Sequence, residues 1–97
     1  MHYFITLEVN KLKYLIAAFR SRNQVMVFYE ILMSYHIKAK IINTPRGATV
    51  SCGLSVRFDH SDFVSVKQVL LRRNFDAFAG FYEVFLIGNN QIVKRYI

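Results

Sequence analysis

Hydrophobic and polar positions alternate along several short stretches of the chain, and this period of two is the pattern of β-strands. IKAKII and LSVRF show the alternation, FAGFYEVFLI is strongly strand-like, and KYLIAAF is a nearly continuous apolar run typical of a covered strand. Asn10 and Lys11 break the first alternating stretch, and Gly88-Asn89-Asn90 predicts a turn before the last one. We predict six strands, at residues 3–8, 13–19, 37–42, 54–58, 78–87 and 91–97.

Two segments have the three- and four-residue spacing of core-facing helices. QVMVFYEILMSY, at 24–35, follows Ser21 and Asn23, either of which can cap a helix N-terminus. The second helix follows Asp59, Ser61 and Asp62, which offer caps and a negative first turn. Its predicted core face is formed by apolar residues at helical spacing: Phe63, Val66, Val69 and Leu70.

The predicted order of elements is β, β, α, β, β, α, β, β, within one domain that spans residues 1–97. Without the terminal strands this is β-α-β-β-α-β, so we predict an α+β, ferredoxin-like sandwich with two helices on one face of an antiparallel sheet. The extra N- and C-terminal strands either extend that sheet or pair with a second copy in a homodimer.

Composition narrows the class of protein. The formal charge is +7, from 13 Lys and Arg against 6 Asp and Glu, which favours acidic partners. The basic residues are scattered, so a solvated basic surface is the simpler reading. One cysteine and no apolar N-terminal leader predict a cytoplasmic protein, and no apolar run is long enough for a transmembrane segment.

Several kinds of site are poorly supported. His2, His36 and His60 are far apart, so we expect no metal and no cofactor; we place His36 at a helix end and expect His60 to be exposed. A single-stranded RNA surface would need aromatic and basic residues on central strands, where Phe58, Arg57 and Tyr82 are candidates. The aromatic-rich RNA-binding octapeptide is absent, so we prefer core aromatics and do not expect nucleic acid as a partner.

Cys52 is the remaining candidate. Lone cysteines are more often buried than reactive, but this one follows a loop that holds the only proline and stands at the start of a strand, beside Gly53. Gly53 would let another molecule approach closely. Nearby positive charge would stabilise a thiolate, the nucleophilic form, and Arg46 is the better candidate because alternation need not place Arg57 on the same face.

The stretch TPRGATVSCGLSVRF, residues 44–58, resembles the Thr-Pro-Arg…Ser-Cys-Gly signature of small bacterial domains known as Se/S carrier-like. The resemblance extends over about residues 12–84. It implies a carrier in sulfur or selenium trafficking, more a shuttle than an enzyme, in which Cys52 holds a persulfide or selenosulfide. The other signature positions are carried over as binding residues: Thr44, Pro45, Arg46, Ser51, Gly53 and Arg57.

The resemblance also implies protein partners, namely a sulfur or selenium donor and an acceptor. The sequence leaves two alternatives to a carrier open. The first is a basic protein-interaction module without thiol chemistry, which docks through strand edges or its Met-rich helix. The second is a single-stranded RNA binder.

Overall fold

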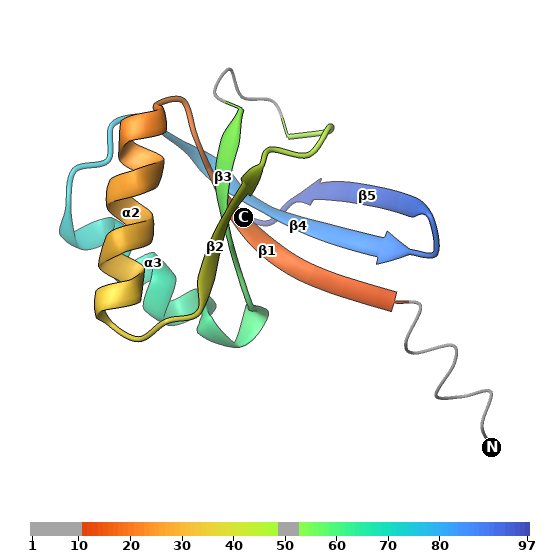
Figure 1. Ribbon diagram of the computed structural model, residues 1–97, viewed down its shortest axis with the longest axis horizontal. Coiled ribbons are helices and arrows are strands. Elements are labelled where there is room, and N and C mark those ends of the chain that lie inside the picture. The colour runs from red at the N-terminus through yellow and green to blue at the C-terminus, as the bar shows by residue number, and fades with distance from the viewer. Residues whose placement is uncertain (1–10, 49–52) are drawn as a thin grey trace.

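The computed structural model describes residues 11–48 and 53–97, which form an α+β fold of two α-helices and a five-stranded antiparallel sheet (Figure 1). A short 3-10 helix, η1, precedes the second α-helix. The elements in chain order are β1 (Lys11–Phe19), α2 (Arg22–Ser34), β2 (Ala39–Asn43), β3 (Leu54–Phe58), η1 (His60–Asp62), α3 (Phe63–Arg72), β4 (Phe78–Ile87) and β5 (Asn90–Arg95).

The strands are ordered β2-β3-β1-β4-β5, and every neighbouring pair is antiparallel. β1 is therefore central, and its apolar run pairs with β3 on one side and β4 on the other. The predicted α+β class, with two helices and an antiparallel sheet, is confirmed, whereas the ferredoxin-like topology stays a prediction. The strand predicted at residues 3–8 lies outside the described residues.

The predicted boundaries agree best where turn residues flank an apolar pattern. The strands at 54–58 and 78–87 are found as predicted. β1 begins at Lys11, where the sequence predicted a break, because Lys11 and Leu12 pair with the end of β4. The final turn is also shorter than predicted: Gly88 and Asn89 alone join β4 to β5, and Gly88 has a φ of +60°, as expected of a glycine in a two-residue hairpin loop.

The helix starts follow the capping chemistry of short polar side chains. Ser21 caps α2, and its hydroxyl accepts a hydrogen bond from the Gln24 N–H at 3.3 Å. Asp59 caps η1 through the Ser61 N–H at 2.9 Å. Asp62 is the N-cap residue of α3 but forms no side-chain capping bond.

Both helices pack on one face of the sheet, which we call the helix face; the opposite surface is the open face (Figure 1). The main core lies between the helices and the sheet and contains Phe19, Phe28, Leu32, Val56 and Val66, among others. A smaller cluster is formed on the open face by alternating residues of β1 and β4: Tyr14, Ile16, Ala18, Tyr82 and Val84. Among the described residues, no helix is long and apolar enough to cross a membrane.

Candidate functional site

The two halves of the Thr-Pro-Arg…Ser-Cys-Gly stretch meet at one end of the β2–β3 hairpin. Asn43 and Leu54 are the last register pair of the two strands. Beyond them the Thr44 N–H donates to the Gly53 carbonyl at 2.8 Å. Thr44 and Gly53 therefore form the base of a closed loop, and residues 45–52 lie between them.

A hydroxyl pair strengthens the base of this loop. The side chains of Thr44 and Ser55 are joined by a hydrogen bond, with their oxygens 2.7 Å apart. Ser55 is completely buried, whereas Thr44 is half-buried. Because a buried hydroxyl needs a partner, the Thr44 side chain satisfies Ser55 and is held in place by it.

The first half of the loop turns back over the open face of the sheet. The Ala48 N–H donates to the Pro45 carbonyl at 3.3 Å, and Gly47 has a φ of +101°. A Cβ atom on Gly47 would lie 3.0 Å from the Cβ of Val93 on β5, so the loop backbone lies directly against that side chain. Only glycine combines this conformation with so close an approach. Arg46, within the turn, is exposed.

Arg57 belongs to the other end of β3. Its guanidinium lies over the ring of Tyr14, 3.9 Å from the ring centroid. Gly53 and Arg57 are separated by about 13 Å along the chain, at roughly 3.3 Å per residue. The structure thus brings Thr44, Pro45 and Gly53 together and leaves Arg57 apart from them.

Two of the predicted site residues, Ser51 and Cys52, lie outside the described residues. Across 11–48 and 53–97, no group of three or more His, Cys, Asp and Glu side chains has the arrangement of a metal site. His60 was predicted to be exposed, but its side chain is only 25% exposed. Its Nε2 pairs with a Glu83 carboxylate oxygen, and its ring contacts Tyr96 edge-on. This pair joins the β3–α3 connection to β4.

Two contacts of the loop were not predicted from the sequence: the hydrogen bond between Thr44 and Ser55, and the contact of Gly47 with Val93. The alternation of LSVRF does place Ser55 on the face opposite Val56, so the face of this polar residue could have been found from the sequence, but its bond to Thr44 could not. No local signal points to Val93, because its contact with Gly47 depends on how the twisted sheet brings β5 toward the β2–β3 loop.

The two aromatic residues proposed for an RNA surface, Phe58 and Tyr82, are buried. Phe58 is only 3% exposed and packs in the main core, edge-on to Phe81. Tyr82 is 7% exposed, and the guanidinium of Arg95 lies over it. Neither ring offers a free face for a base, which agrees with the preference for core aromatics.

Comparison with known proteins gives one match. The model of the family described as "Putative Se/S carrier protein-like" matches residues 13–83, and this range contains the whole loop and both helices. No curated protein and no solved structure matches the chain. Since the match covers well over half of the sequence, the chain belongs to the Se/S carrier-like family.

Proposed function

We propose that this protein carries sulfur or selenium on Cys52, between a donor protein and an acceptor protein. The observation that carries the proposal is the family match over residues 13–83, which spans both parts of the signature. The closed base formed by Thr44 and Gly53 supports it, because it makes the signature one loop rather than two separate segments.

The proposed transfer is a thiol–persulfide exchange. The Cys52 thiolate attacks the terminal sulfur of a cysteine persulfide on the donor. A bond forms between Sγ of Cys52 and that sulfur, the donor's S–S bond breaks, and the donor cysteine leaves as a thiolate. No net oxidation occurs, and an acceptor thiolate removes the sulfur by the same step in reverse. With selenium, the terminal atom is selenium instead.

The described part of the loop supplies supporting roles. Exposed Arg46 provides positive charge that favours the thiolate. Pro45 and Gly47 shape the turn, and Thr44 anchors it through Ser55. Among the described residues, a Cβ added to Gly53 would meet no atom within 4 Å, so this position leaves room for a partner to approach.

The experiment is mass spectrometry of the intact protein after incubation with a cysteine desulfurase and cysteine. We expect a mass increase of one sulfur atom on Cys52, reversed by a reducing thiol and absent from Cys52→Ser. A parallel reaction with a selenocysteine lyase and selenocysteine distinguishes the two elements. Failure of the wild-type protein to accept either atom would contradict the proposal.

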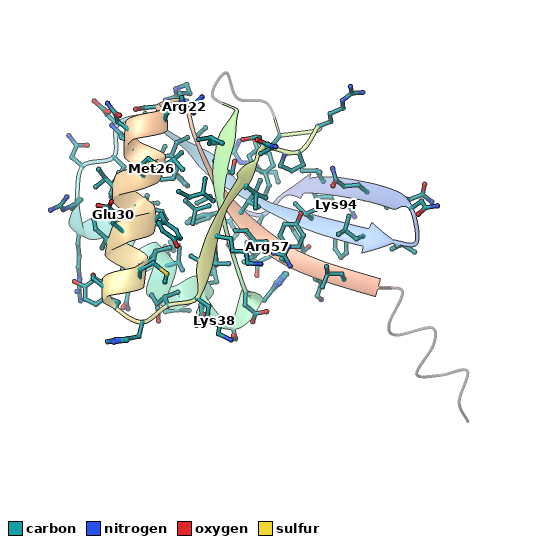
Figure 2. All side chains as sticks on the ribbon, viewed as in Figure 1. Arg22, Met26, Glu30, Lys38, Arg57 and Lys94 are labelled. Carbon is teal, nitrogen blue, oxygen red and sulfur yellow. The ribbon has the colours of Figure 1, made fainter. Side chains whose placement is uncertain are left out.

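The role of Arg46 has its own readout. The rate of Cys52 alkylation by iodoacetamide, followed against pH, reports the thiolate fraction. Arg46→Ala should shift this profile to higher pH, while Arg22→Ala, an equal charge change on the exposed side of α2 (Figure 2), should not. Identical profiles for the two variants would remove Arg46 from the site.

We also propose that β1, α2, β2, β3, α3 and β4 form a ferredoxin-like core, to which β5 is added at the edge. The order β2-β3-β1-β4, with both helices on one face, supports this description. In such a core, β2 and β3 form a hairpin at one edge of the sheet.

A further inference from the structure

A basic groove lies at the start of β2, beside the end of β3 and the first residues of β1, and is remote from Gly53. Its volume is about 480 Å³. It is lined by four cationic side chains and one carboxylate, together with Tyr14 and mostly apolar neighbours: the charged residues are Lys13, Lys38, Lys40, Arg57 and Asp59. Figure 2 shows Lys38 just before the start of β2 and Arg57 over the sheet.

The positive charge of this groove is not balanced within the described part of the chain. The only ion pair there joins His60 to Glu83, so no carboxylate of residues 11–48 or 53–97 is paired with the groove's lysines or with Arg57. The one acidic side chain in the lining, Asp59, already accepts hydrogen bonds from the N–H and hydroxyl of Ser61, at 2.9 and 2.6 Å. The groove therefore presents uncompensated cations.

The register of the sheet places two of these cations directly opposite each other. Lys40 on β2 is the cross-strand partner of Arg57 on β3. Like charges in this arrangement destabilise a sheet. The Arg57 guanidinium lies over the Tyr14 ring, which belongs to β1 on the other side of β3 from Lys40. An anion bound at Lys40 would offset the repulsion.

The backbone of β2 offers a second kind of recognition. In the sheet formed by the described residues, β2 is an edge strand with β3 on one side only. An edge strand has unpaired N–H and C=O groups to which an extended peptide can add. Lys38 and Lys40 are two residues apart, so they match acidic side chains at every second position of an added strand. They also disfavour pairing with a basic strand.

The same groove is poorly suited to single-stranded nucleic acid. Base recognition without sequence preference depends on stacking against exposed aromatic rings. Tyr14, the one tyrosine in the groove, is 8% exposed and lies beneath Arg57. Charge and backbone pairing are available here, whereas stacking is not.

We propose that the β2 edge binds an extended, acidic segment of a partner protein, which adds a sixth strand to the sheet while its carboxylates contact Lys38 and Lys40. The proposal does not depend on thiol chemistry, because the groove lies at the opposite end of β3 from the Thr44–Gly53 loop.

The test uses a fluorescein-labelled, blocked heptapeptide in which glutamate and valine alternate. Its affinity is measured by fluorescence anisotropy, and its site by amide shifts in ¹⁵N–¹H correlation spectra. We expect saturable binding, with the largest shifts in residues 38–43, and binding that weakens with salt. Two methylated versions of the peptide test backbone pairing: one carries a methyl group on the backbone nitrogen of every glutamate, and the other on that of every valine. One of the two should bind at least tenfold more weakly than the unmethylated peptide.

Lys40→Glu is the decisive variant, and Lys94→Glu is its matched control. Lys94 is exposed on β5, which is the other edge strand of the described sheet and belongs to the β4–β5 hairpin (Figure 2). We expect Lys40→Glu to weaken peptide binding at least tenfold and Lys94→Glu to change it less than twofold. Lys40→Glu should also raise the melting temperature, since it replaces a like-charge pair with an opposite-charge pair, so misfolding would not explain lost binding.

Three results would overturn the proposal. Equal losses in the two variants would show attraction to the overall charge rather than to the groove. Unchanged affinity of both methylated peptides would exclude strand addition. Tighter binding of a uridine oligonucleotide than of the peptide, abolished by Lys40→Glu, would assign the groove to nucleic acid instead.

Discussion

The hydrogen bond between Thr44 and Ser55 makes the strongest prediction about the loop. Thr44→Val removes one hydroxyl while keeping the shape of the side chain, and Ser55→Ala removes the other. In the first variant the Ser55 hydroxyl stays fully buried without its 2.7 Å partner, which should destabilise the protein by about 1–3 kcal/mol. In the second variant the Thr44 side chain, which is half-buried, retains access to water, and the loss should be about 0.5–1.5 kcal/mol.

The double variant separates the pair from everything else that each residue contacts. If the hydroxyls act together, the Thr44→Val and Ser55→Ala losses should not add, and the coupling free energy should be about 1 kcal/mol. For a domain of this size, 1 kcal/mol corresponds to roughly 4–8 °C in melting temperature. Urea denaturation followed by circular dichroism, with a common slope for the four proteins, measures the cycle.

Additive losses would refute the reasoning. Coupling below about 0.3 kcal/mol is what independent sites show, and it would mean that the hydroxyl pair does not anchor the loop. The backbone hydrogen bond from Thr44 to Gly53 would then be the better supported anchor of the loop base.

Three further predictions concern stability and acid behaviour. Gly47→Ala should destabilise the protein by more than about 1 kcal/mol in urea denaturation, because the φ of Gly47 is +101° and Val93 of β5 lies where its Cβ would be. Gly53→Ala should not have this effect, because no described atom lies within 4 Å of that Cβ position. Equal effects of the two variants would contradict the prediction. Phe28→Ala should cost about 3–5 kcal/mol in the same assay, since its ring is fully buried, and a loss below 1 kcal/mol would contradict that packing. Hydrogen bonds from the Ser61 hydroxyl and N–H lower the pKa of Asp59, so its contribution to stability is present above the pKa of the unfolded chain and is lost as pH falls through the folded value. Ser61→Ala should therefore raise that pKa in an NMR titration, and an unchanged titration would exclude the hydroxyl as its main cause.

Much of the fold was accessible from the sequence because local signals agree with one another. LSVRF has period two, turn residues precede it and a capping aspartate follows it, so β3 was found with its exact bounds. The start of β1 was missed because Asn10 and Lys11 look like a break, while pairing with the apolar end of β4 is decided by tertiary structure. Periodicity reports which residues repeat on a face, not how far a partner strand extends.

The candidate site was less accessible for the same reason. The signature named Thr44 and Gly53 but not the hydrogen bond between them, and it also named Arg57, which lies apart from both. Alternation along β3 puts Arg57 on the open face, yet only the three-dimensional register shows it opposite Lys40. Contacts between residues distant in the chain, such as Gly47 with Val93, have no counterpart in local sequence.

On the open face of the sheet, two arginine guanidinium groups each cover a tyrosine ring, and this arrangement determines which kinds of ligand the face can bind. Arg57 lies over Tyr14, and Arg95 lies over Tyr82. The second contact needs Gly80, where a Cβ would lie 3.0 Å from the Arg95 guanidinium carbon. Both tyrosines are thereby buried beneath cations, so this surface presents charge where bare aromatic rings would present stacking platforms. A partner of this face should therefore be selected by its negative charge and its backbone, and its affinity should fall with ionic strength.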